Sequence, residues 1–324
     1  MQFDINCKDA KLVSNSNHPI NVSVIVPVYN AERFIFECLS SIIKQDFESF
    51  EVLVSDDCSS DRTLLVLDQF REYDCVKIFC QPKNLGITKN CNFLLHQAKG
   101  KYVCFFAGDD VMLPTKLQKQ FLFMQRHPHY SFCYHKAEIL RSYPGDLRKI
   151  FRFKAKPQLK DVEDVIKRMG VPESMSMMVR ASSIPEKMFS ENYNYVSDWL
   201  MQIELALDGG IGFIDEYLCQ YRKFGDNNNK DLSSYEHEFI ELLDYVQNGY
   251  PLLSAACKEG KARYLLGSSF REARVDRRRE ILRESCRLHF TPISAFLLLA
   301  CYVPFVGRLF SFAYSKRMVL KRYI

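Results

Sequence analysis

The segment Tyr102-Val-Cys-Phe-Phe-Ala-Gly-Asp-Asp-Val-Met-Leu-Pro114 is a hydrophobic run that ends in two adjacent acids, Asp109 and Asp110. Ligands of open parallel sheets bind beyond the carboxyl ends of the strands. Two neighbouring carboxylates repel each other unless a cation neutralises them. Because Mg²⁺ takes oxygen ligands and often joins carboxylates to phosphates, the segment predicts a metal–diphosphate site. The alternative is a solvated turn whose acids precede a helix after Pro114.

Two earlier segments share this form, an apolar β-branched run followed by polar residues. They occupy residues 22–30 and 50–61, and the second ends in Asp56-Asp57. Helical spacing of apolar residues follows each of them, over residues 32–44 and 61–73. A third strand is predicted at residues 76–80 and a further helix ending at Gln97. This alternation predicts an α/β fold with a parallel sheet and right-handed crossovers, whose polar strand ends meet at one edge.

Five motifs in order resemble those of family 2 glycosyltransferases of the GT-A fold. They are Ile25-Val-Pro-Val-Tyr-Asn30, Val54-Ser-Asp-Asp-Cys-Ser-Ser-Asp61, Asn84-Leu-Gly86, Ala107-Gly-Asp-Asp110, and Tyr195-Val-Ser-Asp-Trp199 with residues 212–222 after it. The resemblance covers about residues 20–226. It implies a Rossmann-like, mostly parallel central sheet flanked by helices in a catalytic domain of residues 1–226. The nucleotide-sugar half would be about residues 20–135 and the acceptor half about 136–226.

The resemblance implies roles for particular residues of the donor site. Pro27, Tyr29 and Asp57 would contact the base and ribose of a nucleotide-sugar, and Asn84 belongs to the same donor-binding set. The Tyr29 ring can stack on a base. The Asp57 carboxylate can accept a hydrogen bond from the imide N–H of uracil. A UDP-sugar is therefore the expected donor.

The family's catalytic roles carry over in the same way. Asp110 would ligate a Mn²⁺ or Mg²⁺ ion that bridges the two donor phosphates, and Asp109 would bind the ribose or support the metal. Asp198 would be the general base, and Arg222 would reach a phosphate or close the loop over it. Read from the residues alone, Asp198 could also be an N-cap acid that opens a helix over residues 199–207.

The sequence departs from the commonest family pattern at three positions. Ala107 stands where many members have the first Asp of an Asp-X-Asp motif, which would remove one protein ligand of the metal. Ser197 stands where an acid often precedes the base. Phe224 stands where a His often follows the Tyr-Arg pair, so a His-to-metal contact is in doubt. The methionine-rich segment 169–178 is predicted to be core and strand.

The chemistry of sugar transfer asks for the same residue types. A diphosphate leaving group needs its charge offset, which a metal supplies, and an acceptor hydroxyl needs a positioned base. One base and no second carboxylate nucleophile favour a single displacement that inverts the anomeric centre. By analogy with the family, the expected acceptor is a growing glycan or a glycan linked to a membrane lipid diphosphate, as in bacterial surface polysaccharide or O-antigen synthesis.

Two other functions compete with this one. A sugar-phosphate nucleotidyltransferase would normally have a Gly-rich phosphate loop after its first strand, and Val28-Tyr-Asn-Ala-Glu-Arg33 contains no glycine. An inactive sugar-binding or scaffold subunit is disfavoured because Asp57, Asp110 and Asp198 are all present. Composition agrees with a globular protein, since 47% of the 324 residues are hydrophobic and 26% are charged. The twelve cysteines include no Cys-X-X-Cys pair, which favours buried thiols of a cytoplasmic protein over a zinc site.

The C-terminal region, residues 227–324, contains no motif of the family and is predicted to be helical. Residues 258–324 hold 15 Lys or Arg and 5 Asp or Glu, a net charge of +10 in a chain of +5. The apolar run at 293–307 is shorter than the roughly 20 residues of a spanning helix. Together these features predict peripheral attachment to the cytoplasmic face of the inner membrane. The alternative is a helical hairpin packed on the catalytic domain. Nucleic acid is not an expected partner, because the sequence shows no recognisable nucleic-acid-binding module.

Overall fold

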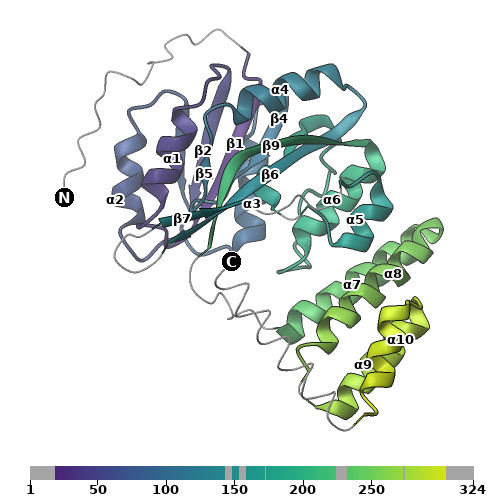
Figure 1. Cartoon of the computed structure of the whole chain (residues 1–324). Helices are drawn as coiled ribbons and strands as arrows, with labels where there is room; N and C mark the ends of the chain where they lie inside the picture. Colours follow the sequence, from purple (N-terminus) through teal and green to yellow (C-terminus); the bar gives the residue numbers. More distant parts are fainter. Residues whose placement is uncertain are drawn as a thin grey trace. The chain divides into compact units, whose positions relative to one another are not determined.

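The computed structural model describes residues 19–142, 148–152, 158–171, 173–223, 232–272 and 274–303. The chain divides into two compact units (Figure 1). The first comprises the residues up to 162 together with 171–230, and the second comprises 163–170 and the residues from 231 onward. The segment 163–170 therefore belongs with the C-terminal helices, although the sequence analysis placed it in the acceptor half of the catalytic domain.

The first unit is built on one mixed sheet, to which the described residues contribute nine strands. Its order is β3 (Val76–Cys80), β2 (Phe50–Asp56), β1 (Val22–Val28), β4 (Tyr102–Phe105), β8 (Met178–Arg180), β6 (Tyr130–Ser142), β9 (Gly210–Lys223) and β5 (Val111–Met112), and β7 (Arg148–Phe151) pairs with β6. Strands β3, β2, β1 and β4 are parallel, as are β6 and β9, and the other pairs are antiparallel. The predicted α/β class and the parallel N-terminal strands are confirmed.

The N-terminal strands form because their apolar runs can be buried on both faces of the sheet. Val24 and Val26 of β1 and Val52 and Val54 of β2 are fully buried, as expected for central strands of a parallel sheet covered by helices on both sides. The helices of this part are α1 (Ile35–Ile43), α2 (Thr63–Leu67) with the 3₁₀ turn η1 (Asp68–Phe70), α3 (Ile87–Gln97) and α4 (Lys116–Arg126). The same burial explains why the predicted strands end where the polar residues begin.

Helices α1 and α2 begin later than predicted, because the residues before them bind each other. The backbone N–H of Asn30 donates to Ser59 Oγ at 2.9 Å, and that of Ser60 donates to Asn30 Oδ1 at 2.9 Å. The N–H of Arg62 donates to Glu32 Oε2 at 2.9 Å. These bonds join the loops after β1 and β2 at the edge of the sheet where the predicted donor site lies.

The remaining elements of the first unit are the 3₁₀ turns η2 (Ser174–Ser176) and η3 (Ala181–Ser183) and helix α6 (Ser197–Asp208). The second unit is helical, as predicted. It contains α5 (Val162–Arg168), α7 (Leu232–Gly249), the 3₁₀ turn η4 (Pro251–Leu253), α8 (Ser254–Ser269), α9 (Val275–Leu288) and α10 (Pro292–Ala300). A Cβ at Gly260 would lie 3.1 Å from the carbonyl oxygen of Ile166, so glycine lets α8 approach α5 closely. Among the described residues no helix is long and apolar enough to cross a bilayer.

Candidate active site

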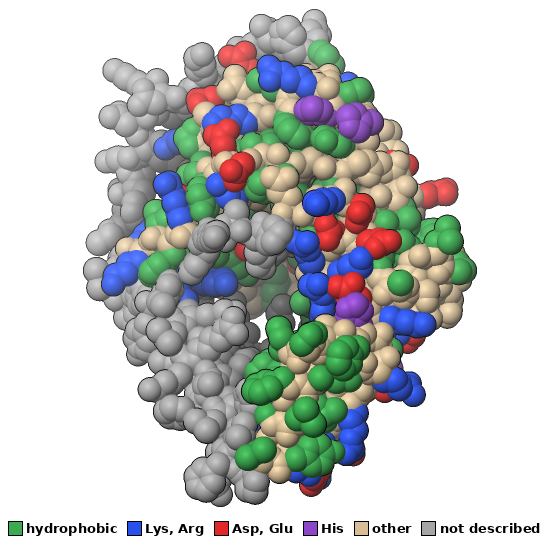
Figure 2. Space-filling view, turned by 45° about the vertical axis from the view of Figure 1, so that its right-hand side comes forward, with side chains coloured by type: hydrophobic (Ala, Val, Ile, Leu, Met, Phe, Trp, Pro, Cys, Tyr) green, Lys and Arg blue, Asp and Glu red, His purple; other side chains and the backbone are tan. Residues whose placement is uncertain are grey.

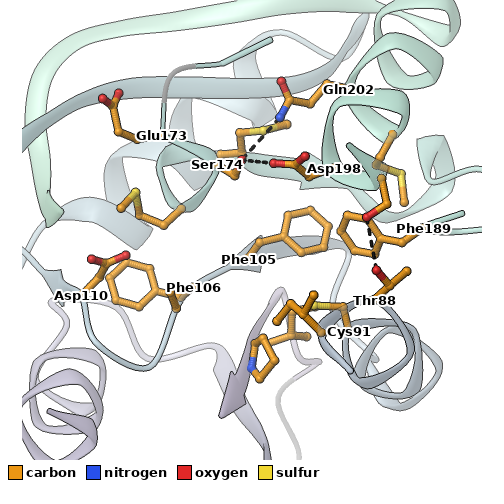
Figure 3. A pocket seen from close by; sticks show the side chains of 18 of the residues that line it. Thr88, Cys91, Phe105, Phe106, Asp110, Glu173, Ser174, Phe189, Asp198 and Gln202 are labelled. Carbon is orange, nitrogen blue, oxygen red and sulfur yellow. Dashed lines mark hydrogen bonds between the residues drawn. The ribbon is translucent and has the colours of Figure 1, made fainter. Parts of the chain in front are cut away.

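A pocket of about 470 Å³ opens at the carboxyl ends of β1 and β4 (Figure 3). Pro27 comes from β1, and Phe106 and Ala107 come from the turn after β4. Elements far apart in the sequence complete the wall, among them α3, η2, α6 and β9. The lining residues from these elements include Thr88, Cys91, Ser174, Asp198, Gln202 and Tyr221.

Asp110 lies in this wall, and of its two carboxylate oxygens only one is bound by a described residue. Its side chain is fully buried, and Oδ1 accepts a 2.8 Å hydrogen bond from the backbone N–H of Arg222. No described residue donates to Oδ2. Burial, with the neighbouring charge of Asp109, raises the pKa of Asp110 to about 8. A buried carboxylate in this state favours a proton or a cation.

Arg222 is buried behind Asp109 and Asp110 and does not line the pocket. Its Nε donates to the Asp109 carbonyl oxygen at 2.7 Å and its Nη2 to Glu37 Oε2 at 2.5 Å. The guanidinium also lies over the Phe34 ring, 5.2 Å from the ring centroid. Burial raises the pKa of Asp109, and the positive charge of Arg222 opposes that rise. The arginine therefore fixes the loop that carries both acids.

Asp57 and Asn84 shape the loop that leads into α3. Asp57 Oδ1 accepts from the N–H of Leu85 at 2.7 Å, and its Oδ2 accepts from the N–H of Gly86 at 2.9 Å. Asn84 Oδ1 also accepts from Gly86, at 3.1 Å. Gly86 has φ +82°, a left-handed conformation that favours glycine. Tyr29 follows β1 directly, and 53% of its surface is exposed.

Asp198 lies in the first turn of α6, whose N-cap residue is Val196. It is therefore not at the N-cap position that the alternative reading assigned to it. Its Oδ2 accepts a 2.9 Å hydrogen bond from Ser174 Oγ, and Gln202 Nε2 lies 3.5 Å from the same oxygen of Ser174 (Figure 3). The carboxylate is exposed and lines the pocket. This arrangement leaves it accessible to a hydroxyl group bound there.

The predicted residues separate into those that line the pocket and those that support it. Pro27, Asp110 and Asp198 line it. Burial, with the nearby charges of Asp198 and Asp57, raises the pKa of the lining residue Cys91 to about 12, so both carboxylates act on the same part of the site. The other predicted residues are not among the lining residues, namely Tyr29, Asp57, Asn84, Asp109 and Arg222. Phe224 lies outside the described residues.

Sequence reasoning missed Glu173 and Ser174, which line the pocket from η2 and the residue before it. The expectation that 169–178 is core and strand is wrong in part. Strand β8 starts only at Met178, and Met169 is 46% exposed with φ +61°. Glu173 adds a third carboxylate to the wall. Burial raises the pKa of Tyr221, and the negative charges of Asp110, Asp109 and Glu173 add to that rise.

The described lining of the pocket contains three carboxylates, those of Asp110, Glu173 and Asp198, and no Lys, Arg or His. A diphosphate would be repelled from such a wall unless a cation came with it. In the part of the chain that the structure describes, no cluster of three or more His, Cys, Asp or Glu side chains could hold a metal alone. A divalent ion that takes one or two carboxylate oxygens and completes its shell with phosphate and water oxygens fits these residues.

Comparison with known proteins identifies the family. The sequence profile of the family described as glycosyl transferase family 2 matches residues 23–183 of this chain. An uncharacterized glycosyltransferase of Haemophilus influenzae is 30% identical over 234 residues, which cover 70% of this chain and 72% of that protein. The chain belongs to glycosyltransferase family 2. The chain is therefore a glycosyltransferase.

The name of a further relative includes the acceptor of that protein. The UDP-Glc:alpha-D-GlcNAc-diphosphoundecaprenol beta-1,3-glucosyltransferase WfgD of Escherichia coli is 28% identical over 233 residues, which cover 70% of this chain and 87% of WfgD. Asp198 and Arg222 lie beyond the residues that the family model matches.

Solved structures confirm the GT-A fold of this family 2 chain. The structure of TarS residues 1–349 of S. aureus in complex with UDP-GlcNAc superposes with a TM-score of 0.63 at 21% identity, over 90% of this chain and 88% of that one. A mannosyltransferase of Pyrobaculum calidifontis in complex with GDP-Man and Mn²⁺ gives a TM-score of 0.50 at 14% identity, over 91% of this chain and 88% of that one. At these identities the likeness concerns the fold alone.

Proposed function

We propose that the chain is an inverting, metal-dependent glycosyltransferase that moves one sugar from a UDP-sugar to a hydroxyl group of a glycan. One observation carries this proposal. The pocket wall is acidic, without a basic side chain among its described residues, and it contains the buried Asp110 oxygen that has no partner. A sugar diphosphate carries negative charge, so its binding in this pocket requires a cation that both it and Asp110 can ligate.

Asp110 is the residue we assign to the metal, Mn²⁺ or Mg²⁺, and Asp109 supports it or binds the ribose. Bound there, the ion would offset the charge that develops on the leaving diphosphate. Arg222 holds the Asp109 carbonyl and gives its backbone N–H to Asp110 Oδ1. These bonds keep Asp110 in one orientation, so that Oδ2 remains available. A phosphate contact of Arg222 itself would require its guanidinium to leave Glu37.

Donor selection is assigned to Pro27, Tyr29, Asp57 and Asn84. The Tyr29 ring is exposed, as a base-stacking side chain must be before the donor binds. Each carboxylate oxygen of Asp57 accepts one backbone N–H and retains a second lone pair, which suits the N3–H of uracil. The names of WfgD and of the TarS complex contain UDP-Glc and UDP-GlcNAc, which supports a uridine donor here.

Asp198 is the residue we assign to proton removal from the acceptor hydroxyl. Its hydrogen bond from Ser174 fixes one carboxylate oxygen, and its exposed position lets an acceptor reach the carboxylate. A positioned base of this kind contributes roughly 10²–10⁴-fold to rate. The hydroxyl oxygen attacks the anomeric carbon as the bond to the diphosphate breaks, and Asp198 takes the proton.

The acceptor we propose is a glycan linked to a polyprenyl diphosphate, used in cell-surface polysaccharide synthesis at the cytoplasmic face of the inner membrane. The name of WfgD, with its diphosphoundecaprenol acceptor, supports this class.

The experiment is transfer from a panel of UDP-, GDP- and CDP-sugars to a synthetic lipid diphosphate glycan, with the anomeric configuration of the product read by NMR. Inverted product from a UDP-sugar is the expected result. Retained configuration would contradict a single displacement and would implicate Glu173, the other pocket carboxylate near Asp110, as a nucleophile. The variant Glu173→Gln separates these cases, because only a nucleophilic role makes it inactive with an intact donor site.

A further inference from the structure

Helix α10 of the second unit presents large apolar side chains to solvent. Phe290, just before the helix, and Ile293, Phe296 and Leu299 within it are each 64–69% exposed. Ile293, Phe296 and Leu299 follow one another at intervals of three residues, so each adjoins the next on the helix surface and the three span an arc of about 120°. We call these four side chains the α10 face. Figure 2 shows hydrophobic side chains gathered on the surface of the C-terminal helices.

The opposite side of α10 is already packed. Leu297 and Cys301 form a small core with Leu282 of α9, and each is no more than 6% exposed. The helix is therefore apolar nearly all round, although only one side is covered by described residues. An apolar face of this kind marks an interaction surface rather than an ordinary solvated helix.

Arginines of α9 hold α10 in place. The Nη2 of Arg279 donates to the carbonyl oxygen of Cys301 at 2.8 Å, and its guanidinium lies 4.4 Å from the centroid of the Tyr302 ring. Arg283 donates to the Tyr302 hydroxyl. These contacts satisfy the C-terminal end of α10 and place two cations and an aromatic ring at that end.

The surrounding sequence has a positive net charge. Residues 258–303 contain ten Lys or Arg and five Asp or Glu, and residues 304–324 add five Lys or Arg and no acid. An apolar face on a basic segment complements an anionic bilayer, where each basic residue near the surface contributes attraction. An aromatic residue with a polar tip, such as Tyr302, suits the headgroup level.

We propose that the α10 face inserts into the headgroup region of an anionic lipid bilayer. A second copy of the chain is a poorer occupant, because a stable dimer needs about 20–30 residues on each side and the α10 face has four. Spanning is ruled out for α10 by length, since nine residues extend about 14 Å and the hydrocarbon core is about 30 Å thick. The inference goes beyond the proposed function, and it needs neither donor nor metal.

The first test places a fluorescent reporter on the α10 face of the full-length chain. The native chain has one tryptophan, Trp199, which is 4% exposed and gives the same background in every variant. Phe296→Trp should show a blue shift with phosphatidylglycerol vesicles and quenching by brominated lipid. Leu252→Trp is the matched control, because Leu252 is 96% exposed in the same unit but lies away from α10, on η4. Equal quenching at both positions, or none at Phe296→Trp, would overturn the proposal.

The second test compares two exposed leucines in sedimentation with the same vesicles. Leu299→Gln should lower the partition coefficient about tenfold, which corresponds to about 1.4 kcal/mol, whereas Leu252→Gln should leave it unchanged. Binding to neutral phosphatidylcholine vesicles as strong as to phosphatidylglycerol would contradict the charge argument. A dimer that Leu299→Gln dissociates, with vesicle binding unaltered, would assign the α10 face to a second copy. Each result stands whether or not the metal-dependent transfer is correct.

Discussion

The pocket of the first unit and the α10 face of the second differ in shape, in charge and in how far the sequence predicts them. The pocket is concave and acidic, and several of its residues belong to motifs that the sequence displays. The α10 face is exposed and lies in a basic segment that contains no family motif. Residues 1–257 hold 29 Lys or Arg and 34 Asp or Glu, whereas residues 258–324 hold 15 and 5. Chemistry and attachment are thus assigned to separate units, of which the first has no net charge and the second has a net charge of +5.

The largest effect that would test this division between the two units is expected from removal of the Asp110 carboxylate, which we assign to the metal. Asp110→Ala should lower transfer by at least about 10³-fold, because the leaving diphosphate would lose its counter-ion at the site. Transfer assays with 1 mM Mn²⁺ measure this, and Mg²⁺ or Mn²⁺ should restore activity to wild-type protein treated with EDTA. Vesicle binding of the variant, measured in parallel, should not change. Substantial activity in Asp110→Ala would move the metal elsewhere.

The next largest effect concerns proton removal. Asp198→Asn keeps the size of the side chain and can still accept from Ser174, but it cannot take a proton. Turnover should fall on the order of 10²-fold or more, while UDP and metal binding stay close to wild type. Single-turnover assays and calorimetry measure the two quantities. If turnover changes only a few-fold, another group must act as the base.

Loss of the Asp57 carboxylate should have a smaller effect, on the preference for uracil over cytosine. In wild-type protein UDP should bind more tightly than CDP, since cytosine has no N3 proton for Asp57 to accept. Asp57→Asn should remove most of that preference, about tenfold, and it keeps one oxygen that can accept from the N–H of Leu85 or of Gly86. Equal calorimetric affinities for UDP and CDP in wild type would place base recognition on another residue.

The last prediction concerns the stability of the metal-free chain. Burial raises the folded-state pKa of Asp110 from 3.8 to about 8, so folding favours the protonated carboxyl. That contribution to stability is present below about pH 4 and is lost as pH rises toward about 8. The melting temperature in EDTA should therefore fall between about pH 5 and 8 more steeply in wild type than in Asp110→Asn. Parallel melting curves for the two proteins over this range would contradict the burial argument.

The sequence was most informative where local patterns suffice. The strands β1, β2, β3 and β4 were predicted because a continuous apolar run ending in polar residues is a local signal of a central parallel strand. The starts of α1 and α2 were predicted too early. The polar residues before them bond across from one loop to the other, as Asn30 does to Ser60, and a local helix signal cannot reveal such pairing.

Long-range contacts account for what the sequence could not predict. Glu173 and Ser174 lie in a methionine-rich segment whose composition indicates core, and their place in the pocket depends on η2 meeting α6. The assignment of residues 163–170 to the second unit depends on the close approach of Gly260 to Ile166. The apolar run at 293–307 predicted attachment or packing of this segment, but not which side chains of 292–300 stay exposed and which pack on α9.

The central claim is that the pocket accepts a nucleotide diphosphate only together with a divalent cation held by Asp110. Calorimetric titration of UDP into the full-length protein, with Mn²⁺ and then with excess EDTA, tests it most directly. The account predicts measurable UDP binding with Mn²⁺ that weakens at least about tenfold in EDTA, and no such metal effect in Asp110→Asn. UDP binding of equal affinity with Mn²⁺ and with EDTA in the wild-type protein would contradict it.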